Sequence, residues 1–148
     1  MRSTEKENAM TRAISDRRNP IYVRNVPQKG RGVFANIPFK IGDLIERAPT
    51  WGFDRSDEKL LERTGLFEYY FVRAMTKPIR NQHSGYVVFG LVSIVNHSSN
   101  PNSQIVWTDE DTGAWASIVA LKDIQADEEI THRYNNINDY PSTIIFVK

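Results

Sequence analysis

The stretch Asn96-His97-Ser98-Ser99-Asn100-Pro101-Asn102 decides how the rest of this sequence is interpreted. It is polar, yet the apolar run Tyr86–Val95 leads directly into it. Asparagine, serine and proline favour turns, because the first two cap local backbone groups and proline fixes φ. A polar cluster at the end of a buried run is either a tight turn between core elements or a functional site. Taken alone, this stretch favours the turn.

Two further stretches, one on each side of the first, change this interpretation. Lys29-Gly30-Arg31-Gly32-Val33-Phe34-Ala35 lies near the start, and Glu128-Glu129-Ile130-Thr131-His132-Arg133-Tyr134 lies near the end. Each is weak alone, since a short Gly-x-Gly is common in tight turns and the second pattern fits any edge strand. In this order, Gly-x-Gly-Val-Phe, Asn-His-Ser-x-x-Pro-Asn and Glu-Glu-Ile-Thr-x-x-Tyr resemble the motifs of the SET-domain family of protein lysine methyltransferases. The resemblance extends over about residues 21–140.

Composition places the chain among ordinary globular proteins. Its 148 residues, 40% hydrophobic and 25% charged, fit one domain. No apolar run reaches the ~18 residues of a transmembrane helix, and the N-terminus lacks the apolar core of a signal peptide. This predicts an intracellular protein or one exported by a route without such a signal. There is no cysteine, which excludes disulfides and thiolate zinc clusters. Because many larger SET enzymes carry Cys-rich zinc modules, this chain resembles the small, stand-alone bacterial and viral members.

Charge is distributed unevenly, although the net charge is only +1. Residues 1–47 carry ten Lys or Arg and five Asp or Glu, whereas residues 107–148 carry three and eight. The acidic end includes Asp109-Glu110-Asp111 and Asp127-Glu128-Glu129. Such a surface could attract a basic peptide, while a solvated loop and a solvated turn explain the two clusters equally well. The near-neutral total argues against direct binding of nucleic acid.

Short, β-branched and aromatic runs separated by turn residues predict a mainly β domain with little helix. We expect a flexible leader over residues 1–19 and a single domain over 20–148. A short helix is predicted from Ser56 to Arg63, and Gly90–Val95 fits either a strand or a helical turn. The resemblance adds a SET-domain, β-clip-like fold of several small sheets, with a C-terminal pseudoknot in which the last segment passes under a preceding loop. Strands are expected at 21–26, 32–35, 43–47, 66–72, 86–89, 103–107, 114–120 and 129–133.

The resemblance also implies a binding site for S-adenosyl-L-methionine. In SET domains the Gly-x-Gly turn lies against the methionine end of this cofactor, which here corresponds to Gly30 and Gly32 with the backbone of Lys29 and Arg31 nearby. The motif residues Asn96 and His97 would contact it as well, His97 mainly through its backbone and by packing. His83 and His132 show no metal-ligand spacing with His97, so no metal site is expected. Tyr140 and Phe146 are further candidates, since they could cover the cofactor from the C-terminal side.

Two tyrosines are the candidate catalytic residues. Family members place the tyrosine that corresponds to Tyr134 where the cofactor's methyl group meets the lysine channel. Its hydroxyl could accept weak C–H···O contacts there, whereas a free tyrosine pKa of ~10 makes it a poor base. Tyr69 belongs to the aromatic stretch Glu68-Tyr69-Tyr70-Phe71, which is similar to the channel wall of small SET proteins. A purely structural role in the core is the alternative for both side chains.

The sequence therefore predicts an enzyme that transfers methyl from S-adenosyl-L-methionine to lysine in a protein with a basic tail, such as a histone, in the nucleus or a host nucleus. Two departures from the family pattern, His132-Arg133 before Tyr134 and Asn135-Asn136 after it, favour the alternative of a SET-like module that binds without turnover. A β-rich domain unrelated to methylation is a third interpretation. The apolar run Ile144–Val147 could form a homodimer contact or dock on its own domain.

Overall fold

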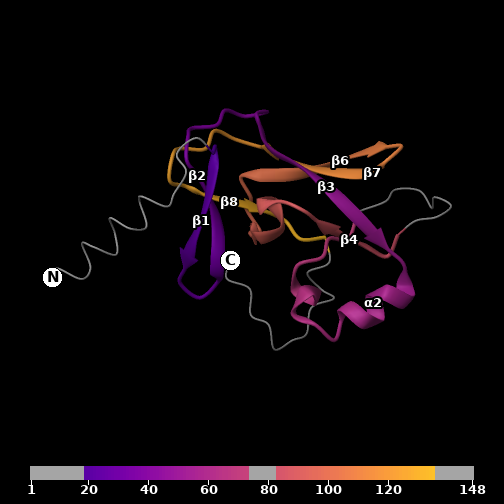
Figure 1. Cartoon of the computed structure of the whole chain (residues 1–148). Helices are drawn as coiled ribbons and strands as arrows, with labels where there is room; N and C mark the ends of the chain where they lie inside the picture. Colours follow the sequence, from indigo (N-terminus) through magenta and orange to yellow (C-terminus); the bar gives the residue numbers. More distant parts are fainter. Residues whose placement is uncertain (1–18, 74–82, 136–148) are drawn as a thin grey trace.

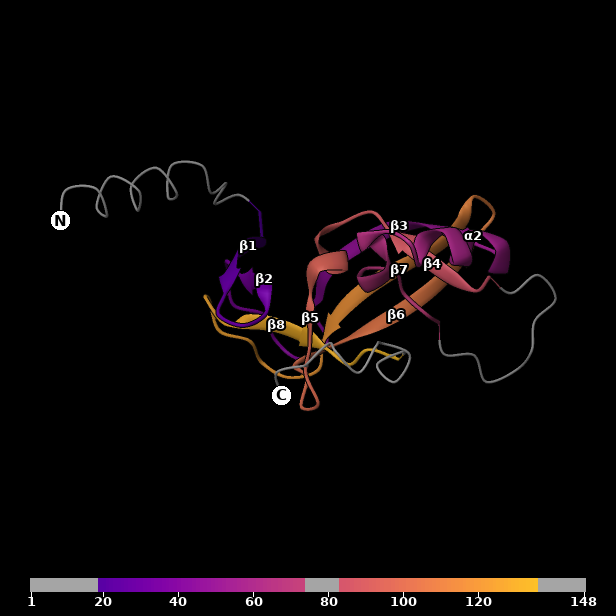
Figure 2. The same cartoon turned by 90° about the horizontal axis from the view of Figure 1, so that it is seen from below.

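The chain forms two four-stranded sheets that share one core, shown in Figures 1 and 2 for a computed structural model. The structure describes residues 19–73 and 83–135. The first sheet has the strand order β1-β2-β8-β5, and the second has the order β4-β3-β7-β6. Seen from below, the first sheet lies at one end of the molecule and the second at the other (Figure 2). The mainly β architecture of several small sheets expected from the sequence is confirmed.

The first sheet joins segments that are far apart in the sequence. Its strands are β1 (Ile21–Val26), β2 (Gly30–Ala35), β8 (Glu129–His132) and β5 (Asn96–His97). β1 and β2 form an antiparallel hairpin, and β2 also pairs antiparallel with β8. β8 then pairs in parallel with β5, so that His132 lies opposite His97. One sheet thus contains part of each of the three stretches that the sequence singled out.

The second sheet is a larger antiparallel layer. It consists of β3 (Leu44–Phe53), β4 (Gly85–Val88), β6 (Ser103–Glu110) and β7 (Gly113–Ala120). β6 and β7 are joined by a two-residue turn, because Glu110 pairs with Gly113. Gly113 has φ +130°, a backbone conformation that side chains rarely adopt, so glycine suits the turn. The hairpin expected between residues 103 and 120 is confirmed, with longer strands than predicted.

Short helices follow β3 and precede β5. Helix α2 (Arg55–Leu61) confirms the helix predicted after residue 55, but its N-cap is Asp54, which accepts hydrogen bonds from the backbone N–H groups of Ser56 and Asp57. A 3-10 helix, η2 (Leu91–Ile94), resolves the ambiguity between strand and helical turn before β5. The apolar run before the polar stretch is therefore not one continuous strand.

The strand predicted at Leu66–Val72 is wrong. This segment begins with a 3-10 helix, η1 (Gly65–Glu68), capped by the Thr64 side chain, and its last part makes a single β-bridge between Phe71 and Tyr86. Aromatic packing explains the difference. Tyr70 packs edge-on against Phe53, and its ring centroid lies 5.4 Å from that of Phe53. Tertiary contacts with β3 thus override the strand propensity of an aromatic-rich sequence.

A single buried cluster holds the two sheets together. Val33, Val92, Ile124 and Ile130 are among its completely buried members. Each comes from a different segment, so the cluster ties the motif-bearing sheet to the rest of the domain and fixes where the candidate site lies. The cluster consists of Ile21, Val33, Ala35, Phe39, Ile45, Ala48, Val88, Val92, Val95, Ala116, Ile118, Ala120, Ile124 and Ile130.

Several expectations concern parts of the chain outside the described residues. They are the leader at 1–19, of which only Asn19 is described, Tyr140 and Phe146, the apolar run at 144–147, and the part of the pseudoknot beyond Asn135. Within the described part, β8 is inserted between β2 and β5 although the chain reaches it last. No helix within 19–73 and 83–135 is long and apolar enough to cross a membrane.

Candidate active site

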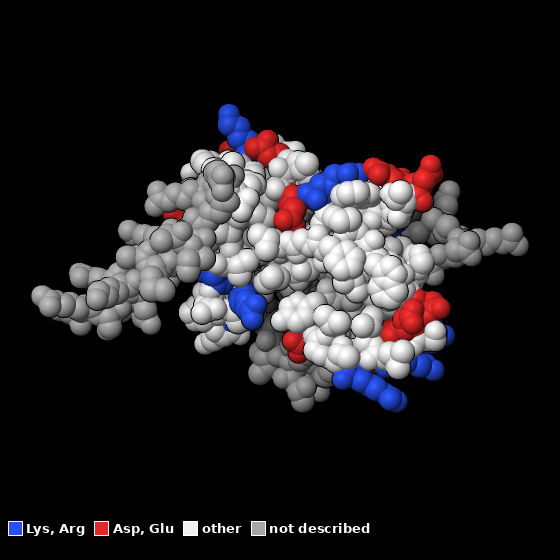
Figure 3. All heavy atoms as spheres, in the orientation of Figure 1, with Lys and Arg blue, Asp and Glu red and all other residues white. Residues whose placement is uncertain are grey.

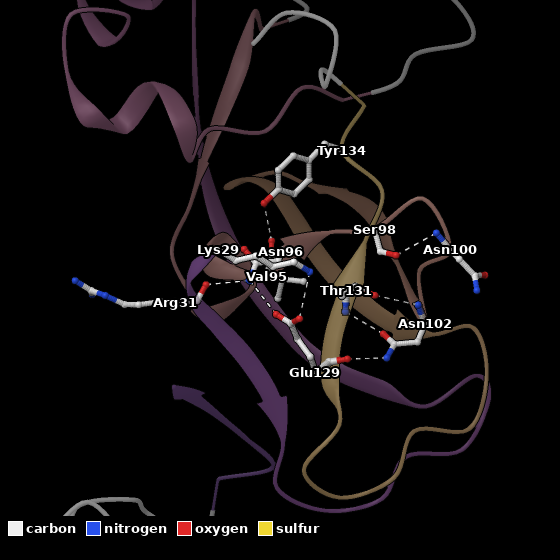
Figure 4. Close-up of polar contacts among 10 residues, drawn as sticks. All are labelled: Lys29, Arg31, Val95, Asn96, Ser98, Asn100, Asn102, Glu129, Thr131 and Tyr134. Carbon is white, nitrogen blue, oxygen red and sulfur yellow. Dashed lines mark hydrogen bonds and ion pairs between the residues drawn. The ribbon is translucent and has the colours of Figure 1, made fainter. Parts of the chain in front are cut away.

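The three sequence motifs meet at the side chain of Asn96. Its Nδ2 atom donates a hydrogen bond to the backbone oxygen of Arg31 at 3.0 Å and another to Glu129 Oε2 at 2.9 Å. These contacts span 65 and 33 residues of sequence. Figure 4 shows Asn96 between the β2 strand that carries Arg31 and the β8 strand that carries Glu129. The first, second and third motifs therefore form one polar cluster.

Lys29 adds a positive charge to this cluster. Its Nζ atom lies 3.5 Å from Glu129 Oε1, and the two side chains are only 18% and 19% exposed. Lys29 lies in the β1–β2 turn, where its backbone N–H donates to the oxygen of Val26 at 3.1 Å. The sequence prediction used only the backbone of Lys29, whereas the structure brings its ammonium group to the site.

The two glycines of the first motif are needed for different structural reasons. Gly30 has φ +80°, which favours glycine, and the space where a side chain would begin is open to 4 Å. At Gly32, a Cβ atom would lie 2.5 Å from Glu129 Oε2 and 2.7 Å from Val26 Cγ2. Gly32 is therefore required for Glu129 and Asn96 to come together over the β2 backbone.

The polar stretch after β5 is both a turn and part of the site. Ser98 Oγ accepts a hydrogen bond from the Asn100 backbone N–H at 3.1 Å. The Asn102 side chain bridges to β8: its Nδ2 donates to the oxygen of Glu129 at 2.8 Å, and its Oδ1 accepts from the N–H of Thr131 at 2.9 Å. The two interpretations that the sequence left open thus apply to different residues of one stretch.

Tyr134 is held by this stretch immediately after β8. Its backbone N–H donates to His97 Nδ1 at 3.0 Å, and its hydroxyl donates to the backbone oxygen of Val95 at 2.9 Å (Figure 4). The Tyr134 ring lies between two imidazoles, with centroid distances of 5.2 Å to His97 and 5.0 Å to His132. The backbone of Tyr134 is therefore fixed against β5, and its hydroxyl is fixed against the residue that precedes β5.

A cavity of about 490 Å³ opens beside Tyr134. Aromatic residues on three segments line it: Tyr70 and Phe71 after η1, Trp107 on β6, and Tyr134 itself. Asn96, His97 and the two glycines do not line it. Tyr134 thus contacts His97 and Val95, the neighbours of Asn96 in the polar cluster, and also forms part of the cavity wall. It is one of the residues that connect the two regions.

Comparison with known proteins agrees with this geometry. The SET domain model matches residues 30–135. This chain belongs to the SET-domain family. A relative from Schizosaccharomyces pombe, a histone-lysine N-methyltransferase specific for H3 lysine 37, is 30% identical over 120 residues, which cover 80% of this chain and 76% of the relative.

Solved structures show the same fold. A Plasmodium falciparum protein described as a candidate histone methyltransferase has a TM-score of 0.60 and 23% identity, covering 79% of this chain and 94% of its own. A second structure, solved to explain the product specificity of histone lysine methyltransferases, gives a TM-score of 0.60 and 23% identity. It covers 78% of this chain, which spans half of that longer protein.

Most of the site residues predicted from the sequence come together in this SET domain. Lys29, Gly30, Arg31, Gly32, Asn96 and His97 lie in or next to the polar cluster, and Tyr134 adjoins them. Tyr69 is separate: its side chain is 49% exposed and does not line the cavity. The neighbouring Tyr70 and Phe71 occupy the cavity wall that was predicted for Tyr69.

His97 is an uncharged hydrogen-bond acceptor in this SET domain. Burial lowers its pKa below 6.5, and the nearby charges of Arg133 and Lys29 lower it further. Because Nδ1 accepts from the Tyr134 N–H, the proton of the neutral ring is on Nε2. Within the described ranges, no three His, Asp or Glu side chains are grouped so that they could hold a metal ion.

Sequence reasoning missed two residues of the site, Glu129 and His132. Glu129 was noted only as part of a motif, but its carboxylate contacts both Asn96 and Lys29. His132 is buried, stacks on Phe71 at 5.4 Å and lines the cavity, and burial lowers its pKa to about 4. The sequence signal for His132 was its departure from the family pattern, and its burial follows from the alternation along β8, where Ile130 is also buried.

Proposed function

We propose that this SET domain transfers a methyl group from S-adenosyl-L-methionine to the amine of a lysine in a protein substrate. Membership of the SET family and the histone-lysine methyltransferase relative support protein-lysine N-methyltransferase activity. The observation that carries the proposal is the position of Tyr134, which contacts the motif cluster on one side and lines an aromatic cavity on the other. A methyl transfer needs such a junction between a cofactor site and a lysine channel.

The polar cluster around Asn96 fits the amino-acid end of the cofactor. S-adenosyl-L-methionine supplies an electrophilic methyl on a sulfonium and carries an α-ammonium and an α-carboxylate. Asn96 offers Oδ1 as an acceptor, Lys29 offers a cation, and the turn at Gly30 is open where a side chain would begin. The backbone groups of Arg31 and His97 complete the proposed set of cofactor contacts. That Tyr140 covers the bound cofactor stays a prediction.

Tyr134 and Val95 would provide oxygen atoms around the reacting carbon. The hydroxyl of Tyr134 donates to the oxygen of Val95, so the phenol oxygen is held in one place with its lone pairs directed elsewhere. Oxygens fixed in advance can accept C–H···O contacts from an electron-poor methyl without reorganising during the reaction. We expect Tyr134 to orient and stabilise and not to act as a base.

The aromatic cavity would receive the lysine side chain. An amine starts with a pKa of ~10.4, and transfer into an apolar channel lowers that pKa and favours the uncharged, nucleophilic form. Tyr70, Phe71 and Trp107 provide this surface, and their faces attract methylated ammonium groups. Tyr69 stays a catalytic prediction, but its exposed position suits a role at the entrance better than one in the wall.

A histone or histone-like tail is the proposed substrate, on the basis of the yeast relative, and the proposed location is the nucleus or a host nucleus. The acidic clusters contribute less to this proposal than their charge suggests. Asp109 is paired with Arg73 through hydrogen bonds of 2.7 and 2.9 Å, and Glu110 is paired with Arg47. Figure 3 accordingly shows charges of both signs on the face it presents. Direct binding of nucleic acid is not proposed, and the homodimer stays a prediction.

The competing proposal is a SET-like module that binds cofactor or peptide without turnover. The observation that favours it is His132, a polar side chain buried next to Tyr134, whose Nε2 has no hydrogen-bond partner among residues 19–73 and 83–135. Binding of cofactor without methyl transfer to any protein would support this alternative. A failure to bind cofactor at all would support a function unrelated to methylation.

The deciding test is transfer of labelled methyl from S-adenosyl-L-methionine to core histones and to a mixed protein lysate. We expect label on lysine with the wild type and a loss on the order of 10²-fold with Tyr134→Phe, which removes the bond to Val95 but keeps the ring. Tyr22→Phe is the matched control, because it removes a surface hydroxyl that donates to Asp127. Equal labelling by the wild type and Tyr134→Phe would overturn the role of Tyr134.

A further inference from the structure

The carboxylate of Glu129 lies at the centre of the polar cluster. One of its oxygens accepts from Asn96 Nδ2 at 2.9 Å, and the other lies 3.5 Å from Lys29 Nζ. The same carboxylate packs so closely over Gly32 that a Cβ atom there would be 2.5 Å from Oε2. Glu129 lies on β8 opposite Phe34 of β2, and β8 pairs on its other side with β5. It is the one side chain within the described ranges that contacts Lys29, Gly32 and Asn96 together.

Glu129 determines how the Asn96 amide is oriented. Both N–H groups of Nδ2 face oxygen atoms, one on Glu129 and one on the Arg31 backbone, so the reversed orientation would place Oδ1 against two acceptors. Oδ1 is at the opposite end of the planar amide and therefore faces away from the carboxylate. Within residues 19–73 and 83–135 no group donates a hydrogen bond to it. The site thus presents an acceptor whose direction is fixed by Glu129.

Glu129 also fixes the position of the Lys29 ammonium group. A lysine side chain in a turn would otherwise sample many rotamers in solvent, and ordering it on binding a ligand would cost conformational entropy. The contact with Glu129 holds Nζ beside the carboxylate that also contacts Asn96, before any ligand arrives. The result is a fixed acceptor and a fixed cation in one cluster, which match the ammonium and the carboxylate of an α-amino acid.

We propose that Glu129 is a positioning residue for the cofactor, an assignment that rests on the function proposed above. It orients Asn96 so that Oδ1 accepts a hydrogen bond from the α-ammonium of S-adenosyl-L-methionine, and it holds Lys29 for the α-carboxylate. Glu129 itself touches neither the methyl group nor the substrate amine. Its effect is therefore on affinity for ligands that carry the amino-acid end and not on the adenosine end.

The test compares two ligands that differ only in that end. S-adenosylhomocysteine carries the amino-acid group, and 5′-methylthioadenosine lacks it. We expect Glu129→Ala to weaken binding of S-adenosylhomocysteine about tenfold in isothermal titration calorimetry, and to change the Kd of methylthioadenosine by less than about twofold. Glu129→Gln, which can still accept from Asn96 but cannot pair with Lys29 as a charge, should give an intermediate loss. Glu128→Ala, at the exposed neighbouring position, is the matched control and should leave both affinities unchanged.

The outcomes separate this assignment from the proposed function. Equal weakening of both ligands by Glu129→Ala and Glu129→Gln would show a general structural role and overturn the assignment. Unchanged binding of S-adenosylhomocysteine by both variants would overturn it while the proposed function stands. A wild type that binds neither ligand would overturn the proposed function and the assignment together. Thermal unfolding of each variant identifies any that fails to fold, and Glu129→Gln then provides the comparison.

Discussion

His132 is buried beside Tyr134, and its folded-state pKa makes stability depend on pH. Burial lowers this pKa to about 4, whereas an unfolded histidine titrates near ~6.5. Below pH 6.5 the unfolded chain binds a proton that the folded chain excludes until pH about 4, so stability is full above 6.5 and falls as the pH falls. Between pH 7 and pH 5 this proton binding lowers the free energy of unfolding by about 2 kcal/mol.

Urea unfolding of the wild type and His132→Phe at the two pH values measures this effect. We expect the wild type to lose about 2 kcal/mol more than the variant between pH 7 and pH 5, because phenylalanine can stack on Phe71 but does not titrate. His97, whose pKa is also lowered, contributes a loss in the same direction to both proteins. The same pH slope in both proteins would contradict the burial of a neutral imidazole at position 132.

Single residues also show the limits of the sequence. The resemblance identified the residues of the polar cluster, because their types and order are specific. It could not show that Glu129 contacts Asn96, since that contact depends on the register between β2, β8 and β5. Nor could it choose between Tyr69 and Tyr70. Which of two adjacent side chains faces the cavity depends on the local backbone, and a 3-10 helix stands here where a strand was predicted.

At the level of elements, Asn102 joins the turn after β5 to strand β8. Its side chain satisfies two backbone groups of β8, the oxygen of Glu129 and the N–H of Thr131. Asn102→Ala would leave both groups without their partner, and we expect a loss of about 3 kcal/mol in the free energy of unfolding. Asn100→Ala is the matched control, since this exposed side chain contacts only Lys122 at 3.4 Å within the described ranges, and should change stability by less than about 0.5 kcal/mol.

Chemical denaturation of both asparagine variants gives the comparison. Similar stabilities would mean that the turn is held by its backbone bonds alone, such as that from the Ser98 N–H to the oxygen of His132. A loss of stability confined to Asn102→Ala would show that the packing of β5 against β8 depends on the Asn102 side-chain hydrogen bonds as well as on the short parallel pairing.

Elements with local signals were predicted best. The β6–β7 hairpin and helix α2 follow from turn residues, alternation and a cap within a few residues of each other. The pairing of β8 with β2 joins segments about a hundred residues apart, and its pairing with β5 joins segments about 35 residues apart. Neither pairing has a local signal, so neither was predicted. The error at residues 66–72 has the same origin, because the contact of Tyr70 with Phe53 is not encoded nearby.

At the level of the whole molecule, the candidate site exists only when the complete fold does. Lys29, Asn96 and Tyr134 come from the start, middle and end of the described chain, and each is held by a residue of another segment. A ligand of this site therefore binds the native state and not the unfolded chain. At a hundred times its Kd, such a ligand stabilises the fold by about 2.7 kcal/mol.

S-adenosylhomocysteine should accordingly raise the melting temperature of the wild type by about 5–10 °C at that concentration. Asn96→Ala removes the two hydrogen bonds that join β2 and β8 and, on the proposed function, an acceptor for the ligand, so its melting temperature should start lower and rise much less. Asn100→Ala, in the same motif but exposed, should show the full rise. Differential scanning calorimetry measures all three. An equal rise in all three proteins would place the ligand away from Asn96, because stabilisation follows the affinity of the native state, which a lost contact must lower.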